Sequence, residues 1–178
     1  MARIAIVSAS LSTSSSTTLL ATQIKTALQE AEGDIEFFDL NLRDLAKDIT
    51  NNMLIGFPTG VLYEKLEELY SADAVVMLTP IYNTSYSGLF KMFIDILDMD
   101  LVREKPVLLG ATGGTSRHSL ALDYTLRPLF AHLRMPAVPT GVFASSEDWG
   151  SKDDEDSPLS SRIQQASKEL LELISRKS

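Results

Sequence analysis

Residues 74–88 read AVVMLTPIYNTSYSG. The first five form a short, continuous apolar run, which is typical of a strand buried on both faces of a sheet. The next segment, Thr79–Gly88, is mostly polar and carries a proline and a glycine, so we expect a loop there. In Gly88–Leu97 the apolar residues recur on one face at helical spacing. Strand, loop and helix in this order make one unit of an α/β fold.

The same alternation continues outward from this unit in both directions. Short apolar runs predict further strands, and helical periods predict the helices between them. The pattern between Leu42 and Gly60 is weak, and Phe57-Pro58-Thr59-Gly60 is expected to be a loop. The other expected strands are Ile4–Ser8, Ile35–Leu40, Pro106–Ala111 and Val138–Phe143, and the other expected helices lie within residues 19–28, 61–70, 120–133 and 160–174.

This alternation predicts the architecture. Strands that alternate with helices are joined by right-handed crossovers into a parallel sheet covered on both faces. Five strands fit the flavodoxin-like order 2-1-3-4-5. We therefore expect an α/β, flavodoxin-like three-layer sandwich with a five-stranded parallel sheet, formed by residues 1–178 as a single domain. Pro139 lies inside the fifth strand, which suggests a sheet edge or the start of the strand.

Composition excludes several classes of function. The net charge of −8 disfavours nucleic acid as a partner, because an acidic surface repels phosphates. The absence of cysteine excludes disulfides, zinc–thiolate sites and thiol catalysis, and we name no metal ligand. No apolar run reaches the roughly 20 residues that span a bilayer, and no secretory signal is recognisable, so we expect a cytoplasmic protein without a membrane partner. The acidic stretch Glu147–Asp156 is expected to be a solvated loop.

In the expected strand order, ligands bind at the carboxyl ends of the first and third strands, where the order reverses. The loops after Val7, Leu78 and Ala111 therefore carry the candidate site. The first of them, Ser8–Thr18, offers nine hydroxyls and the N-terminus of a helix, which together could bind a phosphate without a lysine. Helix capping alone is the alternative, but it needs only one or two hydroxyls. The loop matches neither glycine-rich nucleotide motif.

The second loop could form a wall for a planar ring. A flavin needs a flat, partly apolar surface with backbone N–H groups near its pyrimidine edge. Pro80–Tyr82 could supply that surface and Asn83–Ser85 the polar contacts. A plain strand-to-helix turn explains the composition equally well.

The third loop, Ala111–His118, contains two glycines that permit a close backbone approach to a planar ligand. The alternative is a mobile connector. Arg117, His118 and Arg127 are candidates to bind a nicotinamide 2′-phosphate, although a lone histidine is more often structural than functional.

Two of these segments resemble a known family. Thr79–Lys91, with Asp95 after it, resembles the signature of NAD(P)H-dependent FMN reductases. The segment from Ala111 to Pro128 resembles the corresponding segment of one subgroup, whose members supply reduced flavin to two-component flavin monooxygenases such as the alkanesulfonate system. The resemblance covers most of residues 3–142. Within the second segment it is carried by Ala111-Thr112-Gly113-Gly114-Thr115, His118, Leu120-Ala121, Asp123-Tyr124, Leu126 and Pro128.

The resemblance implies an NAD(P)H:FMN oxidoreductase. Hydride would pass from NADPH or NADH to FMN, and reduced flavin would go to a partner flavin-dependent monooxygenase. We name no catalytic residue, because hydride transfer needs stacking and orientation rather than an acid or a base. The implied cofactor-binding residues are Ser10, Ser12, Ser15, Ser16, Thr17 and Thr18 for the phosphate, Pro80, Ile81, Tyr82, Asn83, Thr84 and Ser85 for the ring, and Thr112, Gly113, Gly114, Ser116 and His118 from the third loop.

The chain departs from the family at one informative position. Members commonly carry an arginine two residues after the serine at position 10, and this chain has Ser12 there. A phosphate would be less neutralised, so FMN is expected to pass through as a substrate rather than stay bound. In the resembling subgroup a tyrosine at the position of Tyr86 lies in a helix irregularity at the subunit interface. A homodimer or homotetramer is therefore expected.

Two alternatives remain open at this point. The chain could be an NAD(P)H quinone or azo reductase that retains FMN. It could instead belong to another class, a flavodoxin-type electron carrier without a nicotinamide site. The hydroxyl-rich loop does not reproduce the T-x-T-G-x-T motif usual in such carriers.

Overall fold

A parallel sheet forms the centre of the molecule. The computed structural model describes residues 1–149 and 157–176. Five strands lie side by side in the order β2-β1-β3-β5-β6, and every pairing along this path is parallel. These strands are β1 (Ala2–Ser8), β2 (Ile35–Asn41), β3 (Ala74–Tyr82), β5 (Val107–Gly113) and β6 (Val142–Ser145).

The sequence-based fold prediction is confirmed, with one addition. A two-residue strand, β4 (Ser85–Tyr86), folds back antiparallel onto the end of β3 and lies off the main path. Counted without β4, the five parallel strands have the expected order 2-1-3-4-5. β6 is an edge strand, as Pro139 suggested, but it begins at Val142, after the proline.

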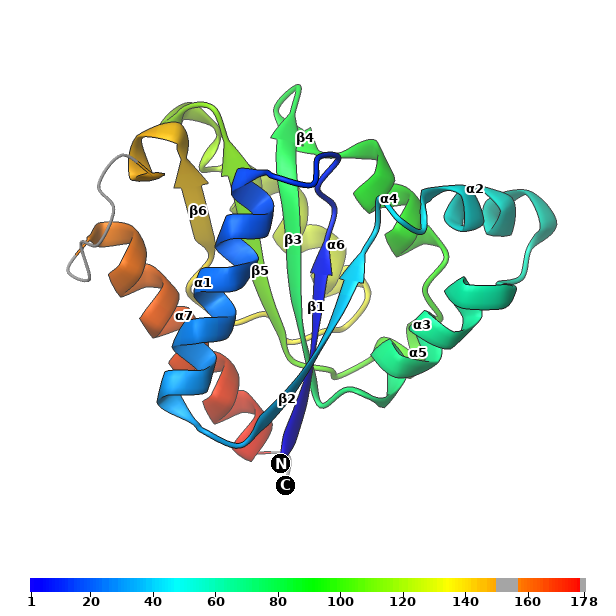
Figure 1. The fold of residues 1–178 in the computed structure, drawn as a ribbon, viewed down its shortest axis with the longest axis horizontal. Coiled ribbons are helices and arrows are strands. Elements are labelled where there is room, and N and C mark those ends of the chain that lie inside the picture. The colour runs from blue at the N-terminus through cyan, green and yellow to red at the C-terminus, as the bar shows by residue number, and fades with distance from the viewer. Residues whose placement is uncertain (150–156, 177–178) are drawn as a thin grey trace.

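Helices cover both faces of the sheet (Figure 1). α1 and α7 pack on one face, around Leu20, Ile24 and Ile163. The remaining helices pack on the other face, around Phe90, Phe93 and Phe130. The helices are α1 (Ser16–Ala31), α2 (Ala46–Ile55), α3 (Gly60–Ser71), α4 (Gly88–Asp95), α5 (Met99–Val102), α6 (Arg127–His132) and α7 (Pro158–Ser175), with short 3₁₀ turns η1 (Ser116–His118) and η3 (Ser146–Trp149) and a π-helical turn η2 (Leu122–Leu126).

Two helical regions were incompletely predicted. The pattern is weak where α2 lies, because this helix buries only Ile49 and Asn52 and leaves Met53, Leu54 and Ile55 exposed. Its apolar residues therefore do not mark one buried face. The helix expected over residues 120–133 is divided into the π-helical turn η2 and α6.

Tyr86 does not lie in a helix irregularity. It is in β4, half-buried, with its ring 5.8 Å from that of Phe90. The helix irregularity is η2, which contains the exposed Tyr124. The position assigned to Tyr86 from the resemblance was therefore wrong, and its place at a subunit interface stays a prediction.

The carboxyl ends of the parallel strands all lie at one edge of the sheet, at the top of Figure 1, and the N-terminus and the end of α7 lie at the opposite edge. The loops after β1, β3 and β5 therefore meet. Of the acidic stretch Glu147–Asp156, the first residues form η3, and the prediction of a solvated loop for the rest falls outside the described residues. Within residues 1–149 and 157–176, no helix combines the length and apolarity needed to span a membrane.

Candidate functional site

A cleft of about 310 Å³ opens at the carboxyl ends of β1, β3 and β5. The three loops selected from the sequence all contribute to it. Its lining residues are Ser10, Leu11, Ser12, Ser15, Ser16 and Thr17 from the first loop, Pro80, Ile81 and Tyr82 from the second, Thr112, Gly113 and Gly114 from the third, and Ser146.

The loop after β1 is shaped by hydrogen bonds among its own hydroxyls. The buried Ser10 Oγ lies 2.6 Å from the Ser12 carbonyl oxygen and 2.6 Å from Ser15 Oγ. It also accepts a hydrogen bond from the Ser12 N–H at 3.2 Å. Ser15 is the N-cap of α1 and accepts from the Thr18 N–H at 3.1 Å. Capping thus accounts for the Ser15 hydroxyl, and the other hydroxyl residues of this loop that line the cleft are Ser10, Ser12, Ser16 and Thr17.

Thr17 has a different role from its neighbours. Its Oγ1 lies 2.7 Å from Thr112 Oγ1, and both residues are buried. This pair connects the first turn of α1 to the end of β5 across the floor of the cleft. Thr18 is exposed and does not line the cleft, although its hydroxyl lies 3.2 Å from that of Ser15.

The second segment is a β-hairpin rather than a loop. β3 continues through Tyr82, and a two-residue turn leads into β4. Asn83 and Thr84 have φ angles of 49° and 68°, the conformation of a type I′ hairpin turn. Asparagine tolerates this region, whereas a β-branched threonine is strained there.

A buried hydroxyl fixes the base of this hairpin. Thr79 Oγ1 accepts a hydrogen bond from the Ser87 N–H at 3.1 Å, and Ser87 in turn caps α4. Pro80, Ile81 and Tyr82 consequently line the cleft, whereas Asn83, Thr84 and Ser85, which we expected to make polar contacts, do not.

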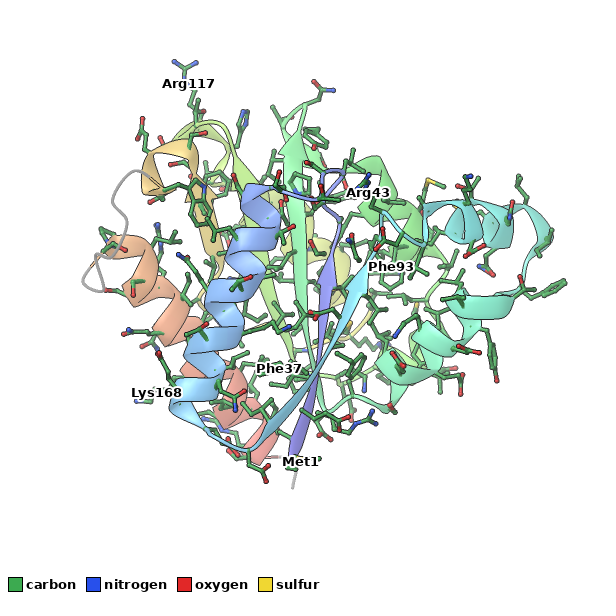
Figure 2. The ribbon with its side chains drawn as sticks, viewed as in Figure 1. Met1, Phe37, Arg43, Phe93, Arg117 and Lys168 are labelled. Carbon is green, nitrogen blue, oxygen red and sulfur yellow. The ribbon has the colours of Figure 1, made fainter. Side chains whose placement is uncertain are left out.

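The third loop contributes backbone to the cleft. A Cβ on Gly113 would lie 3.0 Å from Phe143 Cζ, so any larger residue here requires the Phe143 ring to shift. Ser116 and His118, predicted as cofactor-binding residues, lie in η1 and do not line the cleft. Arg117 is exposed, and its side chain projects away from the body of the molecule (Figure 2).

Arg127 is held by the protein itself. Its Nε donates to Asp123 at 2.8 Å, and its two terminal nitrogens donate to the carbonyl oxygens of Val138 and Pro139. The prediction that it might bind a nicotinamide phosphate therefore lacks support. Lys91 and Asp95, from the resembling segment, form an ion pair at 2.6 Å on α4, and the hydrogen bond that Lys91 donates to Asp95 raises the pKa of Lys91.

Two lining residues were not expected from the sequence. Leu11 is half exposed at the mouth of the cleft, and nothing in its serine-rich surroundings distinguishes it. Ser146 follows the last residue of β6. Extending the rule about strand carboxyl ends to this strand would have found it.

The chemistry of the lining suits FMN. One end offers serine hydroxyls and the first N–H groups of α1, which lack intrahelical acceptors and favour an anion. The other end offers Pro80, Ile81 and the exposed ring of Tyr82 as an apolar wall. Among residues 1–149 and 157–176, no lysine or arginine lines the cleft. This donor set fits a phosphorylated planar ring that is bound without a compensating cation.

Comparisons with known proteins agree with this description. Residues 2–150 match the family model of NADPH-dependent FMN reductase. The chain is 35% identical over 163 residues to an FMN reductase (NADPH) of Pseudomonas aeruginosa, covering 92% of this chain and 88% of that one.

Two solved structures show the same fold over nearly the whole chain. An oxidoreductase from Corynebacterium diphtheriae is 41% identical with a TM-score of 0.92, covering 100% of this chain and 99% of that one. The apo form of the NADH:FMN oxidoreductase EmoB is 31% identical with a TM-score of 0.81, covering 96% of this chain and 90% of that one. The chain belongs to the NADPH-dependent FMN reductase family.

Proposed function

We propose that this protein is an NAD(P)H:FMN oxidoreductase that binds FMN in the cleft above β1, β3 and β5. One observation carries the proposal: in a member of this family, a hydroxyl-lined helix N-terminus and an apolar wall face a single cleft. Bound FMN supplies a ring nitrogen, N5, that accepts a hydride from C4 of the nicotinamide.

The residues of the chain bind and orient the two substrates. Ser10, Ser12, Ser15 and Ser16 hold the phosphate together with the N–H groups at the start of α1. Pro80–Tyr82 supports one side of the ring, and Thr112–Gly114 contacts it from the third loop. The remaining side of the ring is left for the nicotinamide. No side chain needs to give or take a proton, because stacking alone aligns the reacting atoms.

The nicotinamide site is proposed at the mouth of the cleft, near the third loop. Arg117 is exposed there and forms no ion pair with the described residues, so it is available to a 2′-phosphate. His118 is the second candidate. Arg127 is not proposed, since its guanidinium is used by Asp123 and two carbonyl groups.

Reduced flavin is proposed to leave the enzyme. Since no described lysine or arginine lines the cleft, we expect hydrogen bonds and helix N–H groups to hold the phosphate, which favours exchange over permanent binding. The expected acceptor is a partner flavin-dependent monooxygenase in the cytoplasm.

A homo-oligomer, dimer or tetramer, is proposed from the exposed apolar side chains on and between α2 and α3. Apolar surface gathered in one region marks an interaction site more often than scattered residues do. Light scattering of the purified protein tests this proposal, and a monomer would overturn it. The exposed residues are Met53, Leu54, Ile55, Phe57, Val61 and Tyr63.

The function is tested by measuring oxidation of NADPH and of NADH with and without added FMN. We expect colourless purified protein and nicotinamide oxidation that depends on added FMN. Protein that purifies with bound FMN and reduces quinones would instead indicate the retaining reductase. Absence of oxidation with both nicotinamides would rule out the proposed activity.

A further inference from the structure

The end of β6 forms a side of the flavin cleft that no expected site residue occupies. Ser145, the last residue of this strand, is buried, and Ser146, the first residue of η3, is exposed and lines the cleft. The two residues are consecutive, so the direction in which the strand ends decides where Ser146 lies. A carboxylate further along η3 fixes that direction.

The carboxylate belongs to Asp148. Its Oδ2 accepts two hydrogen bonds from Ser145, one from the backbone N–H and one from the hydroxyl, both at 2.7 Å. A carboxylate that reaches back three residues to a backbone N–H is typical of the capping box at the start of a helix. η3 has only four residues, so this contact has little helix to stabilise. Its main effect is to hold the end of β6 in one conformation.

A second partner orients the same carboxylate. Asp148 Oδ1 lies 3.7 Å from Nη2 of Arg162, a residue of α7. The side chain of Arg162 is 44% exposed and that of Asp148 is 23% exposed, so this ion pair contributes little by itself. The hydrogen bonds from Ser145 are stronger, because both end on a charged oxygen at short distance. Asp148 therefore acts mainly on β6.

The same strand end supports the third loop. Ser145 is paired in the sheet with Gly113, which lines the cleft. The ring of Phe143, two residues earlier on β6, also lies close to this glycine. A shift at the end of β6 therefore moves Ser146 and disturbs Gly113 at the same time. Asp148 is not a lining residue, yet it holds the strand end on which these two lining residues depend.

We propose that Asp148 is a positioning residue for the flavin ring, because through Ser145 it sets the places of Ser146 and Gly113. The inference rests on the proposed function, in which the third loop contacts the ring. Asp148 is bonded to β6, whereas the phosphate is proposed to lie at the start of α1. Loss of the carboxylate consequently weakens every flavin that carries the ring, with or without a phosphate.

The test removes the acceptor with Asp148→Ala. Binding of FMN and of riboflavin is measured by calorimetry, at a temperature well below the unfolding transition of the variant. We expect both Kd values to rise about fivefold, so that their ratio stays within about twofold of the parent's. The visible spectrum of FMN bound at saturation should also change, since the ring lies in altered surroundings. Glu147→Ala, at an exposed neighbour in η3 that does not line the cleft, is the matched control and should change none of these quantities.

A conservative variant separates positioning from general stability. Asp148→Asn keeps an oxygen that accepts from Ser145 and should bring both Kd values back to within about twofold of the parent's. A lower unfolding temperature of Asp148→Ala with unchanged Kd values and an unchanged flavin spectrum would overturn the inference, since the contact would then be merely structural. Weaker binding of FMN alone would overturn it as well, because the effect would concern the phosphate. Failure of the parent protein to bind either flavin would instead contradict the proposed function.

Discussion

The two sides of the flavin cleft hold their shape by different means. The loop after β1 is organised by hydrogen bonds that converge on Ser10 Oγ, and a bound phosphate would share the same hydroxyls. The hairpin after β3 is organised by a tight turn with two positive φ angles, at Asn83 and Thr84, and by the buried Thr79 hydroxyl. The first side is adapted to polar chemistry that a ligand can use. The second is a rigid support whose polar tip lies away from the cleft.

The largest expected effect comes from removing the centre of the hydroxyl network. Ser10→Ala should raise the Kd for FMN by about tenfold to 150-fold, because hydrogen bonds to a charged phosphate contribute roughly 1.5–3 kcal/mol. Binding of riboflavin, which lacks the phosphate, should change by less than about twofold. Calorimetry with both flavins measures the difference.

Ser14→Ala is the matched control for this prediction, since Ser14 lies on the same loop but does not line the cleft. It should leave both flavins unaffected. Equal weakening of FMN and riboflavin by Ser10→Ala would show that the loop supports the ring rather than the phosphate.

The next effect concerns the connection between the two sides. Thr17→Val leaves the buried Thr112 hydroxyl without its partner and should lower the free energy of unfolding by about 1–2 kcal/mol. Thr17→Val combined with Thr112→Val removes both hydroxyls and should recover part of that loss. Urea unfolding of the two single variants and the double variant gives the coupling energy, and additive losses would contradict the assigned pair.

A smaller effect of opposite sign is expected at the hairpin. Thr84→Gly relieves a β-branched residue from a φ of 68° and should raise the free energy of unfolding by about 0.5–1 kcal/mol. FMN binding should not change, because Thr84 is not a lining residue. Asn83→Gly should gain less, since asparagine already tolerates this conformation. Weaker FMN binding in Thr84→Gly would show that the turn itself contacts the flavin.

This contrast also explains what could be predicted from the sequence. The buried strands could be predicted because β1, β3 and β5 are continuous apolar runs, and the order of the sheet followed from them. The hydroxyls of the first loop could be predicted because composition alone indicates phosphate chemistry. The hairpin could not, because its turn, Asn83-Thr84, lacks the glycine that usually marks a type I′ turn.

Two further features escaped prediction for physical reasons. α2 directs only Ile49 of its apolar residues at the core, so its apolar residues do not mark a buried face although the helix forms. Ser146 lines the cleft because β6 ends beside β5, and the strand-end rule was applied to the first, third and fourth expected strands but not to the fifth.

The smallest effect is expected at a contact remote from both sides of the cleft. Glu169, on α7, accepts hydrogen bonds from the N–H and Oγ1 of Thr140, both at 2.8 Å. Burial raises the pKa of Glu169, but hydrogen bonds from Gln165 and Thr140 and the charge of Arg127 outweigh it and leave the pKa below its usual value. A lowered pKa means that this contact stabilises the fold above the ordinary glutamate pKa and that the stabilisation is lost as pH falls through the folded value.

Glu169→Gln should therefore unfold at a slightly lower temperature than the parent at pH 7, and the difference should shrink as the solution is acidified. FMN binding at pH 7 should be the same in both proteins, whereas a change in it would show that α7 controls the cleft through β6.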